Sequence, residues 1–308
     1  MNRREYLQKL LALAAWPAVT AQAGERRYLV GFAQDNLSND FHAAQVTRLA
    51  ERFSREPLVN FVFSDAEGQT AKQIADIEEF IARKVDLLIV APRDAKAMVP
   101  VVAGAYRRGI PVILLSRRID GDSYTCLVGP DNEQIGAQVA DFMAARMGGK
   151  GAVMMLEGIP TASTAIARGE GFRNRLRRYP GMELVASKVG YYLRGDAIRA
   201  MEEMLGSGLH FDGLFAQSDS MAAGARLAMK KAGVVPSSKV IVGIDYITEA
   251  RQAILNGEQT ASFVYPLCTD EAAEIAIAIL RGRKVAKRRI VPSRLITQRE
   301  ARLAQPIF

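Results

Sequence analysis

The sequence predicts an α/β protein built from two similar, doubly wound parallel-sheet lobes. Short runs rich in Val, Ile and Leu alternate with helix-period segments along most of the 308 residues, which is typical of βαβ units. The apolar runs are continuous, as expected for strands that helices cover on both faces. The pattern restarts after about residue 130, which indicates a second set of the same kind.

The first set of elements covers residues 28–128. Each expected strand is a short apolar run, and each expected helix has apolar residues at helical spacing. The expected strands are 28–32, 59–63, 87–91, 112–115 and 125–128, and the expected helices are 41–55, 70–84 and 97–108.

The second set begins with a helix and then repeats the alternation. Two glycines, Gly148 and Gly149, mark the turn after the first helix. The expected helices are 132–147, 168–178, 195–205, 220–232, 249–255 and 270–280, and the expected strands are 152–156, 184–189, 213–216, 240–244, 260–264 and one near 295–297. Ligands of such folds bind where the carboxyl ends of the strands meet.

The first 23 residues differ from the rest of the chain. Basic residues beginning at Arg3 and Arg4 precede an apolar run, 10–19, and the small-x-small pattern ends at Ala23. This order predicts a signal peptide cleaved after Ala23 and a periplasmic protein. The Arg-Arg-x-aromatic-Leu order is also similar to a twin-arginine signal, and the choice between the two export routes stays open.

Composition narrows the function classes. The formal charge of +8 is spread over several expected helices without interleaved aromatic residues, so we expect no nucleic-acid partner. The two cysteines, Cys126 and Cys268, are interpreted as buried thiols, with a disulfide left open. With two His, His42 and His210, and no HExxH pattern, we expect no metal, no cofactor and no catalytic residues.

Seven segments, in the same order, resemble the ribose-type family of sugar-binding periplasmic proteins, over essentially the whole chain after Ala23. They are Leu37-Ser38-Asn39-Asp40-Phe41, 71–78, 109–112, Glu157-Gly158-Ile159-Pro160, Arg168-Gly169-Glu170-Gly171-Phe172, Phe215-Ala216-Gln217-Ser218-Asp219 and Val242-Gly243-Ile244-Asp245. The resemblance implies a type I periplasmic binding protein with a three-strand hinge. It places one lobe at 24–129 plus 265–292, and the other at 130–264 plus 293–308.

Three candidate ligand-binding residues follow the first expected strand. The amide of Asn39 can hydrogen-bond a polyol, and the ring of Phe41 can stack on the apolar face of a sugar. The alternative is a helix N-cap followed by a core Phe. His42 stands where the resembled family often has a second aromatic residue.

Ser116 and Arg117 follow the fourth expected strand, where the resembled family usually has Asp-Arg. Arg117 keeps the fork of donors, but Ser116 lacks the charged acceptor. Ser218 stands for a family Asn, Ile166 for a binding Arg, and Val264 for a hinge Gln. These departures favour a ligand with an apolar face and fewer hydroxyls than ribose.

Three further candidates complete the predicted site. Tyr192 aligns with the second stacking aromatic residue of the resembled family. Asp245 ends a strand, where a buried carboxylate needs ligand donors or Arg117, unless it caps the next helix. Glu67 is a charge near the expected cleft that can pair with Arg117 or accept from the ligand.

The resemblance implies a monomeric binding protein that closes around a small carbohydrate-like ligand, and not an enzyme. Its membrane partner is expected to be an ABC permease that imports the ligand. The alternative is a membrane receptor or histidine kinase that senses the liganded protein. Modified sugars, furanoses, cyclic polyols, nucleoside-like compounds and small signal molecules all stay open as ligands.

Overall fold

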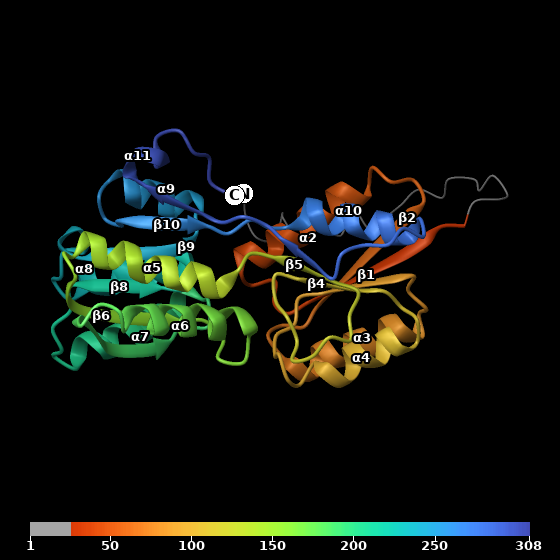
Figure 1. Cartoon of the computed structure of the whole chain (residues 1–308), viewed down its shortest axis with the longest axis horizontal. Coiled ribbons are helices and arrows are strands. Elements are labelled where there is room, and N and C mark those ends of the chain that lie inside the picture. The colour runs from red at the N-terminus through yellow and green to blue at the C-terminus, as the bar shows by residue number, and fades with distance from the viewer. Residues whose placement is uncertain (1–25) are drawn as a thin grey trace.

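The computed structural model describes residues 26–308, so the expected export signal at 1–23 lies outside the described residues. The two predicted parallel-sheet lobes are confirmed, and Figure 1 shows them side by side. The first sheet has the strand order β11 (Arg288–Ile290), β5 (Cys126–Gly129), β4 (Val112–Leu115), β3 (Leu87–Val90), β1 (Tyr28–Gln34), β2 (Val59–Asp65). The second has the order β12 (Arg294–Thr297), β10 (Ala261–Val264), β9 (Val240–Asp245), β8 (Gly213–Ala216), β6 (Lys150–Glu157), β7 (Gly181–Val189).

Helices cover both faces of each sheet, which is why the strands read as continuous apolar runs. In the first lobe they are α2 (Asp40–Phe53), α3 (Thr70–Ala82), α4 (Val99–Arg107) and α10 (Thr269–Leu280). In the second lobe they are α5 (Asn132–Arg146), α6 (Ser163–Leu176), α7 (Arg194–Gly206), α8 (Asp219–Lys231), α9 (Thr248–Leu255) and α11 (Gln298–Ala301), with a 3-10 turn η1 (Pro236–Ser238). Among the described helices, none has the length and apolar character needed to cross a membrane.

Three segments pass between the two sheets. They lie between β5 and α5, between β10 and α10, and between β11 and β12. The short strand β11, which the sequence pattern did not reveal, pairs in parallel with β5, whereas β12 is antiparallel to β10. The chain therefore returns to the first lobe for α10 and β11 before it ends in the second.

Each lobe has apolar core clusters on both faces of its sheet. In the first lobe, Cys126 from β5 and Cys268 before α10 lie in the same cluster. Both are free and buried, which confirms the interpretation as buried thiols. Burial raises the pKa of Cys126, and it raises that of Cys268 beyond the usual range of a thiol, so both stay protonated and unreactive at neutral pH.

Candidate functional site

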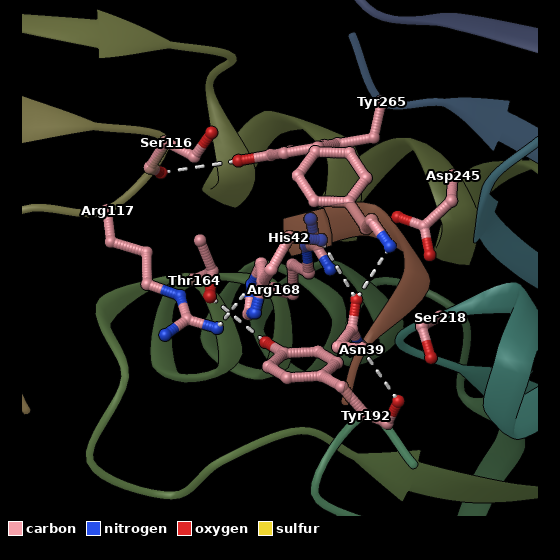
Figure 2. A pocket seen from close by; sticks show the side chains of 11 residues that line it. Asn39, His42, Ser116, Arg117, Thr164, Arg168, Tyr192, Ser218, Asp245 and Tyr265 are labelled. Atoms are coloured by element: carbon pink, nitrogen blue, oxygen red, sulfur yellow. Dashed lines mark hydrogen bonds between the residues drawn. The ribbon is translucent and has the colours of Figure 1, made fainter. Parts of the chain in front are cut away.

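A pocket lies between the lobes, where the carboxyl ends of strands from both sheets face each other (Figure 2). It contains about 360 Å³ of empty space, a volume that includes its open mouth. Its lining residues are Asn39, Phe41, His42, Ser116, Arg117, Thr164, Arg168, Tyr192, Ser218, Asp245 and Tyr265. The first five come from the first lobe, so a ligand here touches both lobes.

Eight of the nine candidate residues line this pocket, and Glu67 does not. Glu67 has a left-handed backbone, with φ of 52°, in the turn before α3. Its side chain is 64% exposed, and its carboxylate lies 3.8 Å from Nζ of Lys72. The pairing of Glu67 with Arg117 was therefore wrong, because the turn directs Glu67 to solvent.

Three lining residues were absent from the candidate set: Thr164, Arg168 and Tyr265. The helix expected at 168–178 begins five residues earlier, at Ser163, and this adds a turn that carries Thr164 four residues before Arg168. Residues at that spacing share a helix face, whereas Ile166 lies on another face and is 37% exposed. The Thr-x-x-x-Arg spacing was the signal available in the sequence.

Asn39 joins the lobes in addition to capping α2. Its Oδ1 accepts from the backbone N–H groups of Phe41, at 2.9 Å, and His42, at 3.4 Å. Its Nδ2 donates to the carbonyl oxygen of Tyr192 in the other lobe, at 3.1 Å. The N-cap alternative is therefore correct for Asn39, and its second amide N–H, which has no acceptor among residues 26–308, is left for a ligand.

Aromatic rings form much of the wall. The ring of Tyr192 lies directly over Gly158, where a Cβ would come within 1.9 Å of Cζ of Tyr192. Its hydroxyl is 3.0 Å from Oγ1 of Thr164. Tyr265 is 2% exposed, its ring centre lies 5.5 Å from that of Phe41, and its hydroxyl donates to the Ser116 carbonyl at 3.3 Å. These contacts fix flat apolar surfaces against which a sugar ring can pack.

Arg117 is the buried cation of the first lobe, 4% exposed. The sequence suggested Asp245 or Glu67 as its partner, but its Nη1 donates instead to Oδ2 of Asp35 at 2.7 Å. Its Nη2 lies 3.2 Å from Nε2 of His42. Burial lowers the pKa of Arg117, but Asp35, Tyr192 and Tyr265 together raise it by more, so the guanidinium is charged whenever a ligand arrives.

Arg168 is a buried cation of the second lobe, 3% exposed, and it lines the pocket. Its Nε donates to Oδ1 of Asn132 at 2.9 Å and its Nη1 to the Gln217 carbonyl at 2.7 Å. Its Cζ lies 4.4 Å from the ring centre of Tyr265. Its Nη2 has no partner among residues 26–308, so it is available to a ligand oxygen.

Asp245 supplies a carboxyl group at the end of β9. Its backbone is left-handed, with φ of 119°, and the cap of α9 is Ile247, so the capping alternative was wrong. Burial raises the pKa of Asp245 well above its ordinary value, Arg168 offsets this in part, and Asp219 adds to it. A ligand hydroxyl can thus donate to this carboxylate or accept from its protonated form.

The assembled groups suit reversible binding of a small polar ring. Two guanidinium groups and one carboxyl group offer hydrogen bonds, and rings supply apolar contact. Over the described part of the chain, no group of His, Cys, Asp and Glu side chains has the arrangement of a metal site.

Known proteins match this chain over most of its length. Residues 30–284 match the family model described as "Periplasmic binding protein domain". The ribose import binding protein of Bacillus subtilis (strain 168) is 28% identical over 286 residues, or 92% of each chain. The galactofuranose-binding protein of Escherichia coli (strain K12) is 29% identical over 261 residues, or 82% of each chain.

A solved structure supports the fold independently. The fructose binding periplasmic domain of a hybrid two component system matches with a TM-score of 0.85 and 28% identity, over 91% of this chain and 93% of that one. The resemblance to sugar-binding periplasmic proteins is therefore confirmed. The chain belongs to the periplasmic binding protein family, a family of solute-binding proteins rather than enzymes.

Proposed function

We propose that this protein binds one small cyclic sugar or polyol between its lobes and delivers it to an ABC permease. The observation that carries the proposal is the pocket, to which Arg117 and Arg168 contribute donors from opposite lobes. Tyr192 and Tyr265 add apolar ring surfaces. Relatives of similar length bind ribose and galactofuranose, and each of these sugars has a single ring.

Contacts between the lobes support binding by hinge closure. The Ala95 N–H donates to the Thr161 carbonyl at 2.9 Å, and the Arg118 N–H donates to Oγ of Ser163 at 2.8 Å. Together with the bond from Asn39, they join the two lobes next to residues that line the pocket, since Arg118 follows Arg117 and Ser163 precedes Thr164. A ligand that bridges the lobes would add to these contacts and favour the closed form.

The proposed place of action is the periplasm. The basic and apolar segments before Ala23 support export and cleavage at that residue. Fractionation of cells that express the full chain, with N-terminal sequencing of the product, tests this: we expect a periplasmic protein that begins at Gly24. A cytosolic product that keeps residues 1–23 contradicts it.

A thermal-shift screen of the chain from Gly24 onward tests the ligand class. Ribose, L-arabinose, galactofuranosides, xylitol and myo-inositol are each added in excess, with nucleosides and amino acids as comparison sets. A ligand at 100 times its Kd stabilises by about 2.7 kcal/mol. We expect stabilisation only by members of the sugar and polyol set; stabilisation only by a nucleoside or an amino acid contradicts the proposed class.

A sensory role is the second candidate, because the domain of the hybrid two component system is 28% identical to this chain. Deletion of the gene separates the two roles. Loss of uptake of the radiolabelled ligand supports transport. Unchanged uptake with loss of the transcriptional response to that ligand supports sensing.

A further inference from the structure

Asp35 is a buried charge beside the pocket that the candidate set did not include. It directly follows β1 and is 0% exposed. Its backbone N–H donates to Oε1 of Gln34 at 2.9 Å. A buried carboxylate without partners would be costly, so its surroundings must compensate for its charge.

The compensation comes from Arg117 and His42, which line the pocket, and from Arg93, which does not. Oδ2 of Asp35 lies 2.7 Å from Nη1 of Arg117 and 3.5 Å from Nη1 of Arg93, and Oδ1 lies 2.8 Å from Nδ1 of His42. Burial alone would raise the pKa of Asp35, but Arg117 and His42 outweigh burial and hold it well below the usual range of a carboxyl group. Asp35 therefore carries a full negative charge.

These contacts assign the tautomer of His42. Arginine has donors only, so Nε2 of His42, at 3.2 Å from Nη2 of Arg117, must accept. The proton then resides on Nδ1, which faces both the carbonyl of Asn36 at 3.1 Å and Asp35 at 2.8 Å. The carbonyl has the better hydrogen-bond geometry, since Oδ1 of Asp35 has no aligned donor in the described chain. The Asp35 charge nevertheless favours a proton on Nδ1.

Arg117 is fixed by the same network. Nη1 donates to Asp35 and reaches the Pro92 carbonyl at 3.4 Å, and Nη2 donates to His42. Within residues 26–308 this leaves the Nε–H and one Nη2–H without partners. Because the other N–H groups of the guanidinium are hydrogen-bonded, the Nε–H and the remaining Nη2–H are held in fixed positions, where a ligand can accept from them.

We propose that Asp35 is a positioning residue that sets the orientation of Arg117 and the tautomer of His42, and so determines the strength of ligand binding. Asp35 is fully buried and does not line the pocket, so it acts on a ligand only through Arg117 and His42. The inference rests on the proposed function for its ligand, but its effect on His42 does not depend on any ligand.

The test compares Asp35→Asn with a matched control in the chain from Gly24 onward. That chain has two histidines, His42 and His210, so ¹⁵N-histidine labelling gives two resolved imidazoles. His210 has its own carboxylate, since its Nε2 lies 2.8 Å from Oδ1 of Asp212, and it is exposed and outside the pocket. Asp212→Asn therefore removes a similar pair elsewhere in the fold.

In the unmodified protein we expect His42 to carry its proton on Nδ1. In Asp35→Asn the new amide N–H faces Nδ1, which then loses its preference for the proton, and Nε2 becomes a competing donor against Arg117. The His42 signals should change to a mixture of tautomers. Asp212→Asn should alter only the His210 signals. A proton on Nε2 of His42 in the unmodified protein overturns the proposal without any variant.

Affinity is measured by calorimetry with the best binder among ribose, L-arabinose, xylitol and myo-inositol. Asp35→Asn should weaken the affinity at least tenfold, while the circular dichroism of the variant stays the same as that of the unmodified protein. Asp212→Asn should leave the affinity unchanged. Loss of affinity together with the change in the His42 signals separates a positioning role from a general loss of structure. Unaltered affinity in Asp35→Asn overturns the proposal. If the unmodified protein binds none of the four, the proposed ligand class fails, and the His42 signals still decide the role of Asp35.

Discussion

Asp219 gives the second lobe a stability that depends on pH. It is the first residue of α8 and is 1% exposed. Its Oδ2 accepts from the Tyr246 N–H and from Oγ of Ser262, each at 2.6 Å, and its Oδ1 accepts from Nε2 of Gln259 at 2.7 Å. Burial raises the pKa of Asp219 to about 6, although these hydrogen bonds and Arg226 oppose it.

The sign of the effect follows from linkage. The folded protein holds the Asp219 proton more tightly than the unfolded chain, whose pKa is the ordinary 3.8. The free energy of unfolding therefore rises as pH falls through 6. Between pH 7 and pH 5 the gain from this one group is about 1.3 kcal/mol, and it approaches about 3 kcal/mol below the ordinary pKa.

The perturbation is Asp219→Asn, which keeps the shape and removes the titration. Urea unfolding followed by circular dichroism at pH 7 and pH 5 gives the free energy of unfolding of both proteins. We expect the unmodified protein to become more stable relative to the variant as pH falls. The difference between their free energies of unfolding should change by about 1.3 kcal/mol from pH 7 to pH 5, whatever its value at pH 7. Asp245, whose pKa is also raised, is present in both proteins, so its titration largely cancels.

Asp212→Asn serves as the control, because its hydrogen bond from the Ala152 N–H lowers the pKa of Asp212, against burial and with help from His210. The stability that Asp212 contributes is lost only as pH falls below the ordinary value, outside this range. A difference between the unmodified protein and Asp219→Asn that is the same at pH 5 and pH 7 would refute the reasoning.

Three other predictions concern the pocket. Asp245→Asn should raise the thermal midpoint at pH 7, because burial opposes its charge, and should abolish binding in the ligand screen; a lower midpoint contradicts this. Gly158→Ala should displace the Tyr192 ring, since its Cβ would come within 1.9 Å of Cζ, and weaken binding by more than tenfold in calorimetry; normal affinity contradicts the stacking role. Asn39→Ala removes a helix cap worth about 1 kcal/mol and the bond to the Tyr192 carbonyl. Small-angle scattering should show a more open protein, whereas an unchanged radius of gyration argues against the lobe contact.

Much of the fold was readable because its signals are local. Apolar runs such as Leu87–Val90 lie in a few consecutive residues, and the glycines after α5 mark a turn without reference to the rest of the chain. The place of the pocket followed too, since the carboxyl ends of parallel strands meet at one edge. Asn39, Arg117 and Asp245 each follow or end a strand, and each lies in the pocket.

Only the tertiary structure showed which charged side chains lie next to each other. Asp35 and Arg117 are 82 residues apart in the sequence, and no local pattern distinguishes Asp35 from a carboxylate in solvent such as Glu67. The early start of α6 placed Thr164 in the pocket, and the crossing after β10 placed Tyr265 there. Sequence by itself determined the two lobes and the edge where the pocket lies. Which ionised groups are buried there, and with which partners, depends on desolvation and on distances across the fold, which only the folded chain defines.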